Sequence, residues 1–176
     1  GDGFLPPLLL DRVQECIRLA SAGQGYASIG EKDNKFALQR NDVIMSRRLA
    51  REVALRTLFQ LDTGHITEAA AFEFALETTP LAAGLVAFAR ELVTMALSHQ
   101  EASDAIISAK SVDWELNRLP RVDRSILRLA IGEMLAAKET PTSVVINEAV
   151  ELAHRYSTEE SGRFINGLLG SVARDE

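Results

Sequence analysis

The feature that most constrains the fold is a series of amphipathic runs between Leu116 and Arg174. Within this stretch, apolar residues recur three or four positions apart in runs that cover residues 118–129, 145–154 and 161–169. This spacing places the apolar side chains on one side of an α-helix, where they can be buried together. A chain with several such runs is expected to fold by packing helix faces against one another.

The middle of the chain adds further helices. Residues 46–62 and 67–77 each show helical spacing of apolar residues. Thr79 and Pro80 are typical of a helix start, because a hydroxyl caps the first turn and proline is tolerated at the first helical position. The spacing then predicts one long helix over residues 80–110, bent near Ser98 and His99.

Downstream, helices are expected to open near Asp123 and Pro141. The last helix begins at Ser157, where Glu160 three residues later would complete a capping box. No segment alternates in the manner of a β-strand. The prediction is an all-α protein, a compact bundle of about six or seven helices.

Residues 1–44 differ from the rest. The segment 21–41 is rich in Gly, Ser, Asn and charged residues without a sustained period, which indicates a linker or loop. Met45, followed by Ser-Arg-Arg, resembles a natural start. We therefore expect residues 1–44 to be an N-terminal extension, an artefact or a flexible arm, and residues 45–176 to form the folded domain.

Composition excludes several classes of function. The single cysteine, Cys16, cannot form an internal disulfide, which fits a reducing compartment, and no apolar run reaches the length of a membrane span. No spaced Cys or His cluster and no phosphate-binding loop occurs, so we expect no metal, no cofactor and no catalytic residue. The net charge of -6 means that nucleic-acid binding would need a local basic patch or a basic partner. We expect a cytoplasmic protein.

One such patch is formed by Arg47, Arg48 and Arg51. Positive charges at a helix N-terminus interact unfavourably with the helix dipole, so arginines at this position indicate a role other than helix stability. Guanidinium groups spaced along one helical turn can reach successive phosphates. Phe59 projects near Arg48, where it could stack a base or pack against the extension. The alternative is a solvated helix face.

A second basic group lies within residues 118–128. Arg121, Arg124 and Arg128 share a helix face and would either contact RNA or pair with carboxylates such as Glu115, Asp123 and Glu133.

Polar residues also stand among apolar neighbours in the last helices. We interpret Asn147 and Asn166 as buried amides that tie helices together. Glu148 and Glu151 do not indicate a glycosidase, because no nucleophile or cleft accompanies them.

Four segments together resemble one family. They are residues 46–62, 122–135, 141–153 and 163–170, and they resemble the arginine-rich first helix and the C-terminal helices of the NusB family of transcription antitermination factors. The most specific are Asn-Glu-Ala-Val-Glu-Leu-Ala and, at the correct spacing, Phe-Ile-Asn-Gly. The resemblance covers about residues 45–175 and leaves residues 1–44 outside.

The resemblance implies a non-enzymatic RNA-binding domain over residues 45–176. Members of the family pair with NusE, a small ribosomal-subunit protein, and the pair binds box A RNA in the leaders of rRNA operons. The complex acts on elongating RNA polymerase so that it reads through terminators. A basic partner would also explain how an acidic chain binds RNA.

The resemblance also implies roles for individual residues. Its RNA contacts are Arg47, Arg48, Arg51, Phe59, Lys110, Arg121 and Arg163. Its partner-binding and RNA-adjacent surface contains Asp123, Glu160 and Phe164, although periodicity alone places Phe164 in the core. The chain departs from the family at Leu49, where a third consecutive arginine is common, at Phe59, where tyrosine is usual, and at Glu160, where aspartate is common.

Two other functions remain open from the sequence. The same helical half occurs in the N-terminal domain of rRNA cytosine-5 methyltransferases, but this chain has neither a Gly-rich methionine-cofactor motif nor a suitably placed catalytic cysteine. The other is a helical protein-interaction module without an RNA role. Some family members form homodimers through the RNA face, and the sequence leaves open whether this chain does.

Overall fold

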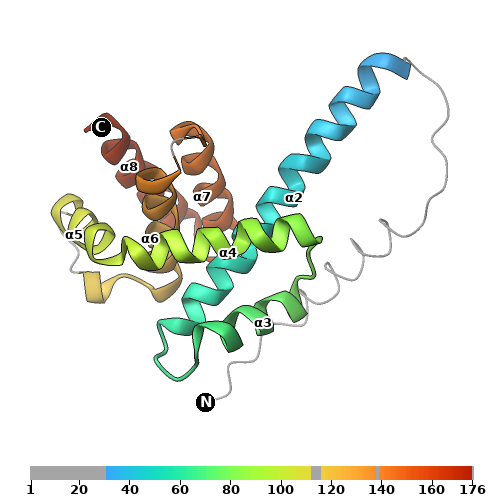
Figure 1. Cartoon of the computed structure of the whole chain (residues 1–176). Helices are drawn as coiled ribbons and strands as arrows, with labels where there is room; N and C mark the ends of the chain where they lie inside the picture. Colours follow the sequence, from blue (N-terminus) through green and yellow to red (C-terminus); the bar gives the residue numbers. More distant parts are fainter. Residues whose placement is uncertain (1–30, 112–115, 138, 176) are drawn as a thin grey trace. The chain divides into compact units, whose positions relative to one another are not determined.

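The structure is a computed structural model that describes residues 31–111, 116–137 and 139–175, with side chains described from residue 46 onward. Its helices are α2 (Glu31–Leu61), α3 (Glu68–Thr78), α4 (Ala83–Ser98), α5 (Gln100–Lys110), a 3-10 turn η1 (Leu116–Arg118), α6 (Arg121–Ala136), α7 (Thr142–Tyr156) and α8 (Glu159–Arg174) (Figure 1). These seven α-helices, with no strand in the described ranges, confirm the all-α prediction. None of the described helices has the length and apolar character needed to cross a membrane.

Contacts between Cα atoms divide the chain into two units, residues 1–39 and 40–176. Of the first unit the structure describes residues 31–39, which are helical. The loop predicted over residues 21–41 is therefore wrong from Glu31 onward, and residues 21–30 lie outside the described part. The reason is that after Gly30 the segment contains Glu, Lys, Ala, Leu, Gln and Arg without Gly or Pro, and this composition favours a helix.

The region expected to form one long helix contains two. α4 ends at Ser98 and α5 begins at Gln100, so the expected bend at Ser98 and His99 is a break. The start predicted at Thr79 and Pro80 is wrong. Thr79 closes α3, and its backbone N–H donates to the carbonyl of Ala75 at 3.0 Å.

The cap of α8 also differs by one residue from the prediction. Thr158, rather than Ser157, is the N-cap, and its hydroxyl accepts a hydrogen bond from the backbone N–H of Ser161 at 3.1 Å. Glu160 therefore lies two residues beyond the cap and does not complete a capping box. A cap side chain accepts from the N–H two or three residues later, so the hydroxyl one position along satisfies the first turn equally well.

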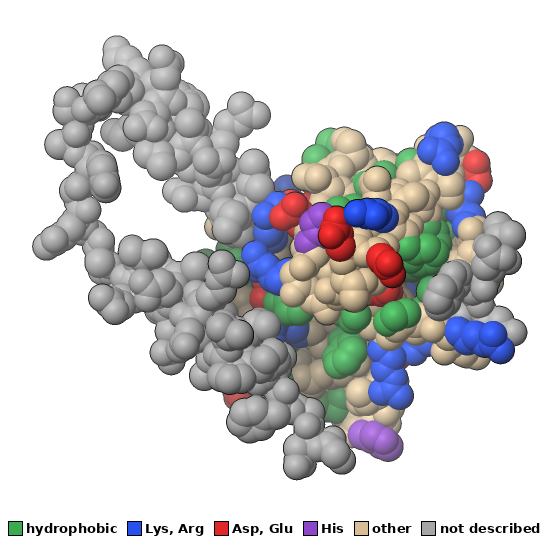
Figure 2. Space-filling model, turned by 180° about the vertical axis from the view of Figure 1, so that it is seen from behind, with side chains coloured by type: hydrophobic (Ala, Val, Ile, Leu, Met, Phe, Trp, Pro, Cys, Tyr) green, Lys and Arg blue, Asp and Glu red, His purple; other side chains and the backbone are tan. Residues whose placement is uncertain are grey.

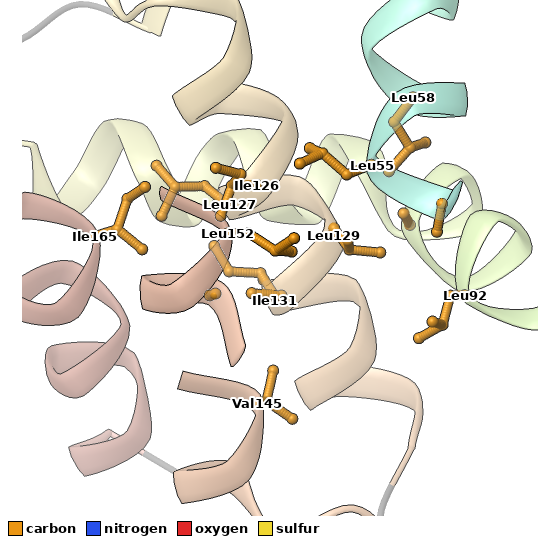
Figure 3. Packing of buried hydrophobic residues seen from close by; sticks show 14 of the residues in the cluster. Leu55, Leu58, Leu92, Ile126, Leu127, Leu129, Ile131, Val145, Leu152 and Ile165 are labelled. Carbon is orange, nitrogen blue, oxygen red and sulfur yellow. The ribbon is translucent and has the colours of Figure 1, made fainter. Parts of the chain in front are cut away.

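The core of the second unit is built around α6, which packs against α4, α5, α7 and α8. Ile126, Leu127 and Ile131 of α6 are fully buried, and Figure 3 shows them among side chains of the neighbouring helices. At the crossing with α4 the backbones approach closely, because a Cβ built on Gly132 would lie 2.7 Å from the Cα of Ala96. The apolar face predicted for this helix is confirmed.

Candidate nucleic-acid interface

Arg47, Arg48 and Arg51 lie within about one turn of α2, beside a face of the helix that is buried in the core. Because α2 begins at Glu31 and not at Ser46, the expectation that these arginines stand at a helix N-terminus is wrong. Ala50, Val53 and Ala54 have no exposed surface and fix this part of α2 against the bundle. The arginines project from the edges of that face, so each can meet either solvent or a neighbouring helix. The structure gives each of them a different environment.

Arg51 is turned into the protein. Its Nε donates to Oε2 of Glu133 at 3.0 Å, and its Nη2 donates to Oε1 at 2.5 Å. The side chains of Arg51 and Glu133 are 5% and 1% exposed. A bidentate pair of this kind uses the guanidinium edge that would otherwise meet a phosphate. In this structure Arg51 ties α2 to α6, and its predicted contact with RNA remains untested.

Arg48 is half-buried against α7. Its Nε and Nη2 donate to the carboxylate of Glu148 at 3.1 and 2.8 Å, and its Nη1 donates to Glu151 at 3.3 Å. The hydrogen bond that Arg48 donates to Glu148 is the main reason why the pKa of Arg48 is raised above its ordinary value. Glu148 is buried, whereas 45% of the Glu151 side chain is exposed. A phosphate could therefore displace Glu151 more readily than Glu148.

Arg47 is exposed and makes no ion pair with any residue whose side chain is described. Its guanidinium carbon lies 4.5 Å from the centre of the Phe88 ring on α4. The same ring lies 5.5 Å from the guanidinium carbon of Arg51. Arg47 is thus the arginine of this cluster whose hydrogen-bond donors remain available.

The cluster is close to charge balance, because Arg47, Arg48 and Arg51 stand beside Glu133, Glu148 and Glu151. On the face shown in Figure 2, acidic and basic side chains likewise lie next to one another. The basic patch expected from the sequence is therefore weaker than three arginines so close together suggest. Any phosphate binding here depends on which donors are unpaired.

Glu52, one residue after Arg51, belongs to a second polar group that joins α2 to α7. It accepts hydrogen bonds from the Tyr156 hydroxyl, from Nη1 of Arg155 at 2.7 Å and from Nη2 of Arg56 at 3.3 Å. Burial, together with the charge and hydrogen bond of Glu52, raises the pKa of Tyr156 to about 12. This group strengthens the attachment of α2 to the bundle.

The other predicted RNA contacts come from separate elements. Phe59 of α2 is 40% exposed, and Arg121 at the start of α6 is exposed without an ion pair among the described side chains. Lys110 donates to Oδ2 of Asp175 at 2.5 Å, and Arg163 pairs with Glu159 at 2.8 Å. Within the described part, no hydrogen bond, ion pair or ring contact links these residues to the α2 arginines.

Arg124 and Arg128 are occupied by carboxylates, which confirms the ion-pair interpretation for these two. Both donate to Asp62, at 2.5 and 3.0 Å, and Arg128 also donates to Asp104 at 2.7 and 2.8 Å. Burial alone would raise the pKa of Asp62, but the two arginines hold it below its usual value. The carboxylates named from the sequence were different: Asp123 and Glu133 have other partners, and Glu115 lies outside the described residues.

The predicted partner-binding residues differ in exposure. Asp123 is 2% exposed and accepts a hydrogen bond from Oγ of Ser161 at 2.7 Å, whereas Glu160 is exposed. Phe164 is half-buried and packs against the core, as its periodicity indicated. Asp123 can thus contribute to a partner surface mainly by holding α8 against α6.

Some features of the site were missed or wrongly placed by sequence reasoning. Asn147 and Asn166 are exposed, so the prediction of buried amides is wrong. The roles of Glu133 and Phe88 were not foreseen, because no local pattern connects them to arginines on α2. Glu148 and Arg48 were both noted, but their pairing was not foreseen.

Comparison with known proteins is consistent with this architecture. The sequence model of the NusB family matches residues 48–174, which include Arg48 and Arg51 of α2 and the helices from α3 to α8. Arg47 lies one residue before the matched range. The chain belongs to the NusB family. The relatives below are named as transcription antitermination proteins.

Among relatives of the NusB family, the transcription antitermination protein NusB of Heliobacterium modesticaldum is 47% identical over 131 residues, which are 74% of this chain and 64% of that protein. The chain thus spans less than two thirds of that relative. The protein of the same name from Pelotomaculum thermopropionicum is 46% identical over 73% of this chain and 89% of its own length.

Solved structures of the family share the fold. NusB of T. maritima is 36% identical and superposes with a TM-score of 0.68, covering 74% of this chain and 92% of that one. A structure described as antitermination factors NusB and NusE in complex with dsRNA has a chain that is 27% identical, with a TM-score of 0.69 over 75% of this chain and 98% of its own.

Proposed function

We propose that this chain is a transcription antitermination factor that binds box A RNA in rRNA operon leaders together with NusE, and so promotes read-through by RNA polymerase. The observation that carries the proposal is the family match over residues 48–174, which covers the bundle and the part of α2 that contains Arg48 and Arg51. The likeness to a chain solved with NusE and double-stranded RNA supports both classes of partner. The setting is the cytoplasm, and RNA polymerase is engaged indirectly.

Charge explains why a partner is needed. The chain has a net charge of -6, and Arg48 and Arg51 already share their donors with glutamates. Because RNA binding depends strongly on unpaired cations near phosphates, this chain alone offers few of them. A basic partner that sits beside the arginine helix would complete the surface.

The contacts divide according to how available each side chain is. Arg47 and Arg121 are exposed cations without an ion pair in the described part, so they contact phosphates directly. Lys110 and Arg163 exchange an exposed carboxylate partner for a phosphate, and the exposed ring of Phe59 stacks a base. Arg48 contacts a phosphate through the Nη1 group that now pairs with Glu151, while Arg51 holds α2 against α6. Asp123, Glu160 and Phe164 lie on or beneath the surface that meets the partner.

The domain organisation completes the proposal. Residues 45–176 form the RNA-binding domain, and residues 1–44 are an extension outside it. The family match, which begins at residue 48, supports this boundary.

The test is fluorescence anisotropy with a box A-like RNA oligomer and a scrambled one, with and without NusE, across a salt series. Selective binding that tightens with NusE and weakens with salt is expected. Arg47→Ala should reduce the salt slope by about 0.7, the value for one contact to single-stranded RNA. No selectivity with demonstrably bound NusE would overturn the proposal.

A matched control is available on α4. Arg90 is also exposed, and its guanidinium carbon lies 4.3 Å from the ring of Phe72, so it repeats the arginine–aromatic contact outside the arginine helix. Arg90→Ala removes the same charge and should leave the salt slope and the selectivity unchanged. An equal loss in both variants would mean that net charge alone governs binding.

A further inference from the structure

Arg47 differs from Arg48 and Arg51 because it contacts an aromatic ring, Phe88, without also pairing with a carboxylate among the described side chains. The Phe88 ring belongs to α4, is half-buried and packs against the hydrophobic core, so its position is fixed by the bundle. The guanidinium carbon of Arg47 lies 4.5 Å from the ring centre, within the range of a cation–π interaction. Phe88 therefore links the hydrophobic core to the exposed guanidinium of Arg47.

The geometry of a guanidinium makes this contact compatible with ligand binding. All five N–H groups lie in the guanidinium plane, so a ring that packs on the guanidinium face takes up none of them, whereas a carboxylate takes two. A stacked arginine consequently keeps its donors and its charge. In contrast, Arg48 and Arg51 each donate hydrogen bonds from Nε and Nη2 to a carboxylate. Arg48 also donates from Nη1 to Glu151.

We infer that Phe88 is a positioning residue for RNA binding, which holds the Arg47 guanidinium in place while leaving its donors free for a phosphate. This inference rests on the proposed function and goes beyond it, because Phe88 is not itself an RNA contact. A free arginine side chain loses considerable rotamer freedom when it binds. A ring that restricts the side chain beforehand reduces that loss.

The Phe88 ring also lies close to Arg51. The guanidinium carbon of Arg51 is 5.5 Å from the ring centre, and the guanidinium is held by Glu133, which is 1% exposed. Glu133, Arg51, Phe88 and Arg47 thus form a series of contacts from the interior of α6 to the surface of α2. Glu133 neutralises Arg51, so Arg47 carries the uncompensated charge of this series.

The first arm of the test asks whether the Phe88 ring affects RNA binding by way of Arg47. Phe88→Leu keeps an apolar side chain but removes the ring, and it should weaken binding of box A-like RNA by the NusE-bound protein about 2- to 5-fold. Phe88→Tyr keeps the ring and should restore binding. In an Arg47→Ala background, Phe88→Leu should cause no further loss. An equal loss in both backgrounds, or no rescue by tyrosine, would overturn the inference.

A second arm tests the same contact in two further ways, first by changing Arg47 instead of the ring and then by observing the free protein without RNA. Arg47→Lys keeps the charge but cannot stack a planar group, and should lose as much affinity as Phe88→Leu. In NMR spectra of the free protein, the ring should shift the Arg47 Cδ protons upfield in the wild type and in Phe88→Tyr, but not in Phe88→Leu. Wild-type shifts in Phe88→Leu would show that the stack does not exist.

The two proposals fail in different ways. If the wild type shows no box A selectivity with NusE bound, the proposed function fails and the inference with it. If the wild type binds selectively and Phe88→Leu binds equally well, only the positioning role of Phe88 is overturned. Thermal unfolding of each variant confirms that the compared proteins are folded.

Discussion

The guanidinium of Arg51 and the carboxylate of Glu133 form two hydrogen bonds inside the protein, at 3.0 and 2.5 Å. Both side chains are almost fully buried, so neither group can turn to water if the other is removed. An arginine that the sequence presents as a surface cation is therefore part of the attachment of α2 to α6. Arg51 therefore differs from Arg47, which is exposed and is proposed to contact RNA.

Arg51→Ala should lower the free energy of unfolding by about 3–5 kcal/mol, because it leaves the Glu133 charge buried without a partner. Urea denaturation followed by circular dichroism measures this loss. Arg47→Ala, one turn away and exposed, should change stability by less than about 0.5 kcal/mol. The paired replacement Arg51→Met with Glu133→Leu should recover most of the loss. A single-variant loss below about 1 kcal/mol would contradict the buried pair.

Gly132→Ala should destabilise the protein by about 1–3 kcal/mol, since the new Cβ would lie 2.7 Å from the Cα of Ala96 and force α4 and α6 apart. Gly167→Ala is the matched control within a helix, because a Cβ there has no atom within 4 Å. It should stabilise the helix by up to about 1 kcal/mol. Melting temperatures of the two variants should thus move in opposite directions, and a shared direction would argue against the close crossing.

Tyr156 should make stability fall at alkaline pH. Its pKa in the folded protein is about 12, above the usual 10, so the folded state holds the proton more tightly than the unfolded state. The resulting stabilisation is present below pH 10 and is lost as pH rises from 10 to 12. Absorbance near 295 nm in a Tyr26→Phe background reports the phenolate. Tyr156→Phe should lose less stability than the wild type over this range, and a phenolate that titrates near pH 10 would refute the expectation.

Glu151→Gln should strengthen RNA binding modestly, about 2-fold, because it releases the exposed edge of Arg48 and removes a charge that repels phosphate. The effect should shrink at high salt. Glu77→Gln on α3 provides an exposed glutamate outside the arginine cluster and should leave affinity unchanged. Anisotropy titrations with the NusE-bound protein compare the two, and equal gains would indicate a general charge effect.

The sequence predicted the helices and their buried faces well because both depend on local spacing. The apolar positions of α6, for example, are those of its period, and Thr67 caps α3 at the expected boundary. The exposure of Asn147 follows from the same rule. Its neighbours Val145, Glu148, Ala149 and Leu152 occupy the inward face of α7, so the amide must point outward.

The candidate site could be predicted only in part. The sequence located the arginine helix, but not the partners of each arginine, because Glu133 and Glu148 lie far along the chain and only tertiary packing brings them to α2. Phe88 had no signal beyond its place in an apolar period. The choice between a phosphate contact and a structural tie is therefore made by the packing of α4, α6 and α7 around α2.

The arginine pairs also bear on how the protein is made. Arg48 and Arg51 precede their glutamate partners by 100 and 82 residues. Since synthesis proceeds from the N-terminus, α2 leaves the ribosome well before the residues that neutralise it. During that interval Arg48 and Arg51 lack these carboxylate partners. Their neutralisation therefore waits for the later helices α6 and α7, so the charge that α2 presents changes as the chain is made.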